Sequence, residues 1–177
     1  DICKSLINVN KRMTYTKVQN ALNKNEEALK EEKDYLEMFN NMETLSKILY
    51  NKRLLRGALE FVTEECKIYL DDKGKPVEIK KYERNTATNI IEEFMLVCNE
   101  TIAEEYSYLE LPFVYRTHEK PDMEKLEYII DLVRNLRINV KISDELHPKE
   151  LQKILEEVKD MDEMKMISKI MLRSMKQ

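Results

Sequence analysis

Two pairs of adjacent acidic residues are the first candidates in this sequence for a chemical role, which would be to bind a metal ion. Asp71-Asp72 and Glu92-Glu93 are adjacent carboxylates, and carboxylate oxygens are the ligands that hard divalent cations prefer. Asp71-Asp72 precedes Lys73-Gly74, so a solvated hairpin turn explains it. Adjacent side chains of a helix point about 100° apart, which makes Glu92-Glu93 a poor metal pair. Neither pair predicts a cation site.

The two histidines and three cysteines do not form a reactive group either. His118 has no other His or Cys near it, and we interpret it as a hydrogen-bonded structural imidazole. His147 precedes a proline and is interpreted as a helix-entry residue. Cys3, Cys66 and Cys98 are odd in number and widely spaced, which favours reduced structural thiols over disulfides or zinc. The sequence also contains no Gly-rich phosphate loop and no nucleophile motif.

Charge and hydropathy exclude further classes of protein. The 177 residues include 36% charged side chains and carry a net charge of −4, without the positive excess of a self-sufficient nucleic-acid binder. No apolar run approaches the length that spans a bilayer, and the amino end has no signal-peptide pattern. We therefore expect a soluble, cytoplasmic protein with no membrane contact. The length is typical of one domain or a large piece of one.

The elements that would position any site are mainly helices, as only two glycines in the chain already suggest. A run of apolar residues on one side predicts a largely buried helix: Ile90, Ile91, Phe94, Met95 and Cys98. Thr86 or Thr88 is its expected N-cap. Shorter helices are expected after Thr14, from Pro121-Asp122, from Pro148 and over 162–175. The apolar faces expected for the last three are Met123, Leu126, Ile129, Ile130, Val133 and Leu136; Leu151, Ile154, Leu155 and Val158; and Met164, Ile167, Met171 and Met175.

A second apolar stripe predicts one helix over residues 26–56: Tyr35, Met38, Phe39, Met42, Leu45, Ile48 and Leu49. We expect this stripe to pack on the chain's own domain, and a coiled-coil partner surface is the alternative. Gly57 is the expected end of the helix, because glycine adopts the left-handed conformation without strain.

After Gly57 the spacing of the apolar residues changes from the helical period to a period of two residues. Leu59, Phe61 and Thr63 alternate with their neighbours and predict a short strand. Residues 67–70 and 76–81 flank the Asp-Asp-Lys-Gly turn and predict a hairpin. The expected fold class is α+β and predominantly helical, with long helices packed around a small antiparallel β-hairpin sheet.

Several segments together resemble the catalytic RNB domain of bacterial ribonuclease R and ribonuclease II, and look closer to the ribonuclease R branch. The matching segments are 12–18 (RMTYTKV), 56–61 (RGALEF), the hairpin around 72–74 (DKG), 84–85 (RN) with 91–95 (IEEFM) and Asn99, 111–121 (LPFVYRTHEKP) and 171–177 (MLRSMKQ). Each segment alone is a weak signal. Their shared order and spacing across the chain make the resemblance specific.

The resemblance implies a processive 3′→5′ exoribonuclease that hydrolyses RNA to nucleoside 5′-monophosphates, using Mg²⁺ held by aspartates of a D-x5-DDA motif. This sequence departs from the family pattern, because it contains neither that motif nor the family's downstream SPIRRY-like segment. We therefore expect residues 1–177 to be the central portion of a single RNB catalytic domain, without the flanking OB-fold domains. Such a fragment would be inactive alone, with no catalytic or metal-binding residue and no bound Mg²⁺.

The family pattern also implies which residues contact single-stranded RNA. Phe61 matches the position whose ring stacks on bases at the 3′ end, although a core role is the alternative. Glu92 matches an acidic residue that contacts the terminal nucleotides, where a carboxylate can accept from ribose hydroxyls. The remaining candidates for the RNA channel are Arg84, Asn99, Arg116 and His118. Because OB-fold domains supply most phosphate binding in this family, weak or absent RNA binding by the isolated fragment is expected.

Two further expectations concern surfaces. Apolar residues near Leu6 and Met175 predict that the fragment exposes apolar surface and self-associates. The alternative function is a non-enzymatic helical protein–protein interaction module built on the stripe from Tyr35 to Leu49. That alternative does not explain why the family segments occur in order.

Overall fold

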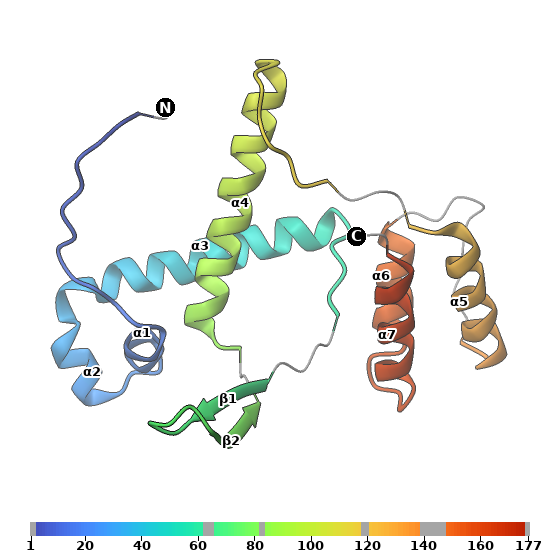
Figure 1. Ribbon diagram of the computed structural model, residues 1–177, viewed down its shortest axis with the longest axis horizontal. Helices are drawn as coiled ribbons and strands as arrows, with labels where there is room; N and C mark the ends of the chain where they lie inside the picture. Colours follow the sequence, from blue (N-terminus) through green and yellow to red (C-terminus); the bar gives the residue numbers. More distant parts are fainter. Residues whose placement is uncertain (1–2, 62–65, 82–83, 118–120, 139–147, 176–177) are drawn as a thin grey trace. The chain divides into compact units, whose positions relative to one another are not determined.

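The computed structural model describes residues 3–61, 66–81, 84–117, 121–138 and 148–175. Within these ranges the chain forms seven α-helices, a short 3-10 helix and a two-stranded antiparallel sheet (Figure 1). The elements are α1 (Tyr15–Leu22), α2 (Glu26–Glu31), η1 (Lys33–Tyr35), α3 (Leu36–Leu55), β1 (Cys66–Leu70), β2 (Pro76–Lys81), α4 (Thr86–Tyr108), α5 (Met123–Asn135), α6 (Pro148–Glu157) and α7 (Met164–Ser174). The predicted class, α+β and predominantly helical, is confirmed.

The chain divides into two compact units, each described by itself. The first unit comprises residues 1–49 and 83–101, and the second comprises residues 50–82 and 102–177. The helices α3 and α4 each contribute to both units. No described helix combines the length and the apolar character that crossing a membrane requires.

The first unit has a small core where α1, α2 and the start of α3 meet. Its buried residues are Ala21, Ala28 and Phe39. Thr14 caps α1 by accepting a hydrogen bond from Lys17 N, as predicted. Asn25 caps α2 by accepting from the backbone N–H groups of Glu27 and Ala28. Two small alanines bring the helices close, and the Phe39 ring fills the space between them.

The helix predicted over 26–56 is interrupted at Glu32, which is a correction to the sequence prediction. The backbone leaves helical geometry there, at φ −109° and ψ 19°, and η1 follows. The Glu32 side chain is buried, and its Oε2 accepts a 2.6 Å hydrogen bond from Lys11 Nζ. That hydrogen bond raises the pKa of Lys11 above its ordinary value. The ion pair therefore ties the extended segment before α1 to the break between α2 and α3.

The start of α4 is capped by a different residue from the two that were predicted. The Asn85 side chain accepts from Thr88 N at 3.0 Å, and Thr88 Oγ1 accepts from Asn85 N at 3.0 Å. This reciprocal arrangement satisfies two backbone donors at the helix start. Asn85 is thus the N-cap, and Thr88 is its partner within the first turn.

The burial predicted for α4 is also wrong. Ala87, Ile90 and Glu93 are its buried residues, whereas Met95 is 59% exposed and Cys98 is exposed. Helical periodicity correctly placed the apolar side chains on one face, but most of that face has no covering layer within the described chain. All three cysteines are free and exposed, so the interpretation of them as structural thiols is wrong.

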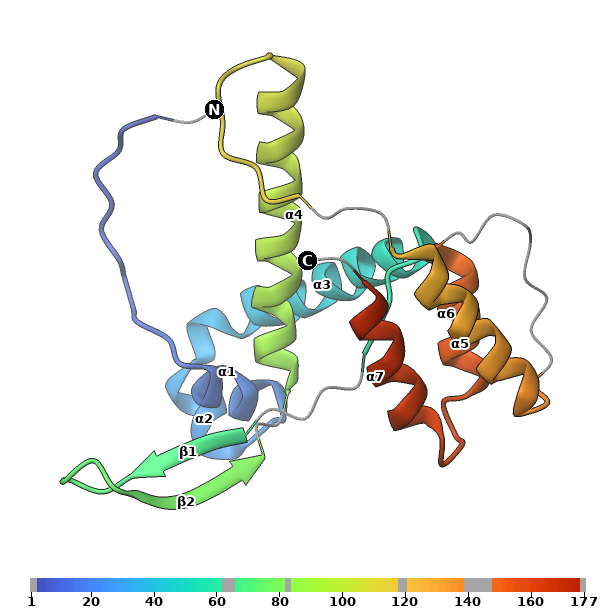
Figure 2. The same ribbon diagram turned by 45° about the vertical axis from the view of Figure 1, so that its right-hand side comes forward.

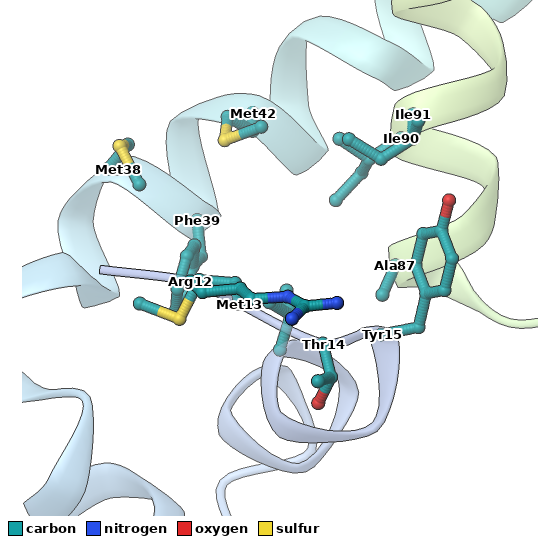
Figure 3. Close-up of a pocket in the computed structure, with 11 residues that line it drawn as sticks. Arg12, Met13, Thr14, Tyr15, Met38, Phe39, Met42, Ala87, Ile90 and Ile91 are labelled. Carbon is teal, nitrogen blue, oxygen red and sulfur yellow. The ribbon is translucent and has the colours of Figure 1, made fainter. Parts of the chain in front are cut away.

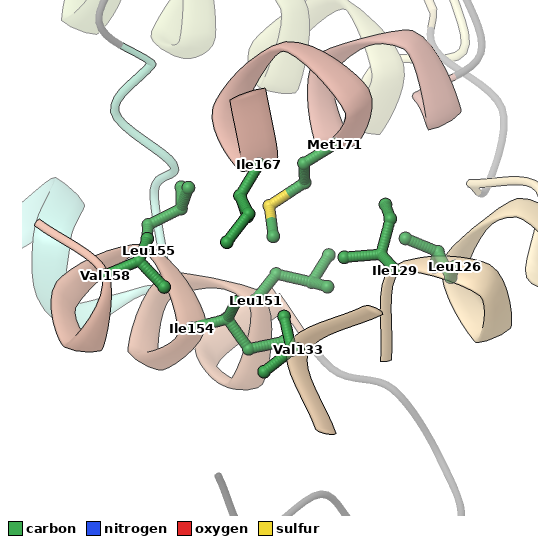
Figure 4. Packing of buried hydrophobic residues seen from close by; sticks show 9 residues of the cluster. All are labelled: Leu126, Ile129, Val133, Leu151, Ile154, Leu155, Val158, Ile167 and Met171. Carbon is green, nitrogen blue, oxygen red and sulfur yellow. The ribbon is translucent and has the colours of Figure 1, made fainter. Parts of the chain in front are cut away.

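The second unit has the larger core, formed by α5, α6 and α7 (Figures 2 and 4). In Figure 4, the labelled side chains of the three helices converge on one interior: Leu126, Ile129, Val133, Leu151, Ile154, Leu155, Val158, Ile167 and Met171. The apolar faces predicted for α6 and α7 are confirmed, and the face predicted for α5 is covered except at Met123, which is 49% exposed. Asp122 begins α5 by accepting a hydrogen bond from Lys125 N, as the Pro-Asp start suggested.

The hairpin forms at the predicted position, with Ile68 opposite Ile79 and Tyr69 opposite Glu78. Its turn is closed by Asp71, whose Oδ1 accepts from Lys73 N and Lys75 N at 2.9 Å. Every residue of both strands is exposed, so the helices of the second unit do not pack on the sheet. The strand predicted at Leu59–Thr63 is not observed either, because residues 58–61 lack regular structure and Thr63 lies outside the described residues.

Several helices end in left-handed residues that are not glycine. Lys24, Glu110 and Arg137 have φ of 60°, 51° and 59°, and each follows the last turn of a helix. Gly57, at φ 96°, ends α3 as predicted, and a Cβ there would lie 3.1 Å from the backbone N of Lys149. Three helix ends therefore use side-chain-bearing residues where glycine is the usual choice, which explains how so few glycines suffice.

The left-handed conformation of Glu110 leads to a testable prediction about thermal stability. Glu110 N donates to Ser107 O at 3.1 Å and Leu111 N to Tyr106 O at 3.2 Å, so the left-handed turn is kept by hydrogen bonds that a glycine preserves. Relief of left-handed strain, worth about 1–2 kcal/mol, exceeds the entropic cost of glycine, about 0.5–1 kcal/mol. Glu110→Gly is expected to raise the midpoint of thermal unfolding, and Glu110→Val to lower it. Equal midpoints for both variants would contradict this account.

Candidate functional site

Glu92 and Arg84 are two of the predicted site residues, and the structure brings them together. Arg84 Nη2 lies 3.4 Å from Glu92 Oε1, across the start of α4. The Asn85 cap fixes the direction in which the chain enters the helix, and so holds Arg84 beside the carboxylate. Both side chains are partly exposed, at 66% and 39%, so this ion pair contributes little to stability. Glu92 Oε2 has no partner within the described chain and can accept hydrogen bonds from a ligand.

Glu93 has a different environment from its neighbour. It is buried, and it has a polar partner in the protein. The Glu93 carboxylate thus has a structural role. Glu92 is the member of the pair that solvent and ligands can reach. Among the described residues, no three His, Cys, Asp or Glu side chains come together to hold a metal ion. These residues therefore do not fit a magnesium site.

Phe61 lies in the second unit, at the end of the irregular segment after α3. Its ring is half-buried and packs with Leu59 against the core of α5, α6 and α7. Between them Glu60 accepts a 2.8 Å hydrogen bond from the Tyr50 hydroxyl, which ties the segment to α3. One part of the ring is anchored by the core, and the exposed part is available for a contact with a ligand.

The other candidate residues differ in how they are placed. Asn99 is exposed on α4. Arg116 is exposed in the extended segment after α4, which aromatic contacts hold to that helix: the Phe113 ring lies 4.5 Å from Tyr106 and 5.4 Å from Tyr115. His118 lies outside the described residues. No described contact joins Asn99 or Arg116 to another candidate.

The first unit contains a pocket that sequence reasoning missed (Figure 3). Its volume is about 550 Å³, and its walls come from the segment before α1, from α1, from α3 and from α4. The lining residues are Arg12, Met13, Thr14, Tyr15, Val18, Met38, Phe39, Met42, Ala87, Ile90 and Ile91. Figure 3 shows the Tyr15 ring next to Ala87, with the Arg12 guanidinium nearby. Ile91, the residue before Glu92 on α4, is one of the lining residues, whereas Glu92 is not.

The missed pocket had a partial signal in the sequence. Arg12, Met13, Thr14 and Tyr15 belong to one of the segments on which the family resemblance rests. Their local pattern predicts the start of α1 and nothing about a cavity. The pocket exists because the apolar faces of α3 and α4 approach this segment, and that long-range packing cannot be inferred from helical periodicity.

Comparisons with known sequences cover the whole chain. The family described as RNB domain matches residues 1–177. The chain is 37% identical over 177 residues to ribonuclease R of Thermotoga maritima, covering 99% of this chain and 25% of that protein. It is 36% identical over 177 residues to ribonuclease R 1 of Lactococcus lactis, covering 99% of this chain and 22% of that protein. The chain thus spans about a quarter of the length of these relatives.

Comparisons with solved structures agree. RNase R of Mycoplasma genitalium in complex with ribose methylated single-stranded RNA superimposes with a TM-score of 0.79 at 25% identity, covering 92% of this chain and 26% of that one. The same protein in complex with double-stranded RNA gives a TM-score of 0.78 over 90% of this chain and 28% of that one. The fold is therefore that of part of an RNase R.

Proposed function

Because the chain belongs to the RNB domain family, we propose that it is the central portion of a single RNB catalytic domain in a 3′→5′ exoribonuclease of the ribonuclease R type. The observation that carries this proposal is the family match over all 177 residues together with 37% identity to a ribonuclease R. The whole protein is cytoplasmic and processively hydrolyses single-stranded RNA to nucleoside 5′-monophosphates, with Mg²⁺ as its cofactor. Among the described residues no three His, Cys, Asp or Glu side chains gather to hold a metal ion. The contribution proposed for these residues is to bind and position RNA.

Glu92 is suited to recognise the sugar of the bound strand. Its Oε1 is held by Arg84, while its Oε2 has no partner among the described residues and can accept a hydrogen bond from a ribose hydroxyl. A deoxyribose lacks the 2′-hydroxyl and cannot donate that bond. Arg84 beside it supplies a positive charge for the adjoining phosphate. This pair thus contributes discrimination between RNA and DNA.

Phe61 supplies a contact that does not depend on sequence. Every base has a π-face, so an aromatic ring holds any 3′-terminal nucleotide with about 1–3 kcal/mol. The packing of Phe61 against the core of the second unit restricts the ring and lowers the entropic cost of stacking. Asn99, Arg116 and His118 are proposed to line the path of the strand.

The test of the proposed function is the direction of degradation by the full-length protein. A 5′-labelled single-stranded RNA should shorten progressively from its 3′ end in the presence of Mg²⁺, and DNA of the same sequence should persist. Glu92→Gln should lower the preference for RNA over DNA. Internal cleavage of the RNA, or no cleavage under any ionic condition, would refute the proposal.

Residues 1–177 alone are proposed to be inactive and to self-associate. Leu6, Ile7 and Val9 are exposed before α1, whereas Met175 is partly covered by the core of the second unit. Sedimentation velocity over a range of concentrations should show species larger than the monomer, because a contiguous apolar segment favours association. Leu6→Ser/Ile7→Ser should shift the distribution towards monomer. A monomer at every concentration for the unmodified chain would count against this.

One observation favours the alternative of a protein–protein interaction module. The stripe on α3 packs on its own unit only through part of its length: Phe39 is buried, but Met38, Leu45 and Ile48 are 46%, 47% and 58% exposed. If the full-length protein degraded no RNA, this exposed part of the stripe would be the surface to examine. The exoribonuclease proposal has the stronger support, because the family match covers the whole chain.

A further inference from the structure

The β-hairpin has one face whose charges are arranged in an unusual way. Lys67 on β1 lies directly opposite Lys80 on β2, and Tyr69 lies opposite Glu78, so these four side chains share a face. The ammonium groups of Lys67 and Lys80 lie 5.2 and 5.3 Å from the centroid of the Tyr69 ring. We call these four residues the lysine face. The opposite face of the hairpin carries the apolar residues Ile68, Leu70, Val77 and Ile79.

Two like charges placed directly opposite each other destabilise a strand pair. The protein offsets this cost only in part. Lys80 Nζ forms a 3.0 Å ion pair with Glu78, but Lys67 has no carboxylate partner within the described chain. Both ion-pair partners are more than half exposed, so solvent screens their attraction. The lysine face therefore keeps an excess of positive charge.

The hairpin as a whole is positive within an acidic chain. Residues 66–81 contain five lysines against two aspartates and one glutamate, a net charge of +2, whereas the whole chain carries −4. The carboxylate of Asp71 is occupied by two backbone N–H groups of the turn. Positive charge is thus concentrated on one exposed element, where an anion can approach it without crossing an acidic surface of the same element.

We propose that the lysine face binds the phosphodiester backbone of RNA, as a contact separate from those proposed for Glu92 and for Phe61. Charge complementarity identifies the ligand, since a phosphate near Lys67 and Lys80 removes the repulsion between them. The Tyr69 ring orients both ammonium groups by cation–π attraction. The contact reads no sequence, because it involves phosphates only. This inference rests on the proposed function, which supplies RNA as the substrate.

The experiment measures binding of single-stranded RNA by the full-length protein, by fluorescence anisotropy over a range of salt concentrations. Lys67→Gln/Lys80→Gln should raise Kd roughly 5–25-fold at about 0.1 M salt and reduce the slope of log K against log salt by about 1.4, since each lost phosphate contact on a single strand accounts for about 0.7. Lys30→Gln/Lys33→Gln removes the same charge from exposed positions of the first unit and should change neither quantity.

Three further variants separate binding from folding. Lys67→Glu places opposite charges on directly opposed residues, so the hairpin should be at least as stable while RNA binding weakens. Glu78→Gln removes the one carboxylate of the lysine face and should tighten RNA binding. Lys67→Arg/Lys80→Arg should retain the affinity and the salt slope.

The possible results distinguish this inference from the proposed function. If the unmodified protein binds and degrades RNA but Lys67→Gln/Lys80→Gln leaves both Kd and slope unchanged, the lysine face is not an RNA contact. If the control pair Lys30→Gln/Lys33→Gln weakens binding equally, the effect is one of total charge, and the inference is again overturned. If the unmodified protein neither binds nor degrades RNA, the proposed function itself fails.

Discussion

Replacing Phe61 with alanine in the full-length protein is expected to lower kcat/KM for single-stranded RNA by roughly 5–150-fold, which corresponds to a lost stacking contact of about 1–3 kcal/mol. The loss should be similar for substrates ending in any of the four bases, because the ring recognises the π-face that all bases share. Steady-state degradation of 3′-variant oligonucleotides measures it. A loss confined to one terminal base would contradict stacking.

Phe61→Leu is the matched control, because the ring has a second role in packing. Leucine retains apolar contact with the core of α5, α6 and α7 but cannot stack on a base. If Phe61 stacks on a base, the kcat/KM of Phe61→Leu should be nearly as low as that of Phe61→Ala. The unfolding midpoint of Phe61→Leu should stay close to that of the unmodified protein. If leucine restores kcat/KM, the alanine effect arises from packing, and Phe61 is a core residue only.

Replacing Ile154 with alanine is expected to destabilise the chain by about 2–5 kcal/mol, which is the range for removing a fully buried branched side chain. Ile154 is 0% exposed and belongs to the cluster shared by α5, α6 and α7 (Figure 4). The three helices pack on one another through the side chains of this cluster. The cavity that Ile154→Ala leaves would therefore weaken the contacts of all three helices. Urea unfolding followed by circular dichroism measures the change.

Ile79→Ala provides the comparison within the same unit. Ile79 is the same residue type, but it is 67% exposed on the hairpin and loses few contacts on truncation. A change of well under 1 kcal/mol is expected for it. Equal losses for Ile79 and Ile154 would mean that the cluster in Figure 4 does not dominate the stability of the second unit.

The helices of the second unit show what periodicity can predict. The face predicted after Pro148 is Leu151, Ile154, Leu155 and Val158, and all four residues are buried, the first three on α6 and Val158 just after its end. On α4 the same reasoning placed Ile90, Met95 and Cys98 on one face, but only Ile90 is buried. A period of 3.6 residues identifies the apolar face of a helix. It does not identify what covers that face, and on α4 the described chain provides little.

The candidate site shows a similar division. Glu92 and Arg84 were identified separately by resemblance, and their contact depends on the Asn85 cap, where a threonine cap had been expected. The sequence predicts a strand at Phe61, whereas its backbone is irregular and its ring packs on helices distant in sequence. The pocket beside Ile91 depends on three helices meeting one extended segment. Local patterns predict elements, whereas sites that join several elements require the tertiary structure.

The measurement that most directly tests the central claim is the nucleotide sequence on both sides of the segment encoding residues 1–177. The account predicts one continuous reading frame, with an Asp-rich D-x5-DDA element upstream and a SPIRRY-like basic element downstream. Phe61, Glu92 and the lysine face would then act on RNA delivered to aspartates elsewhere in the same protein. A start codon and a stop codon that closely bracket Asp1 and Gln177 would contradict the account and make a binding role the leading interpretation.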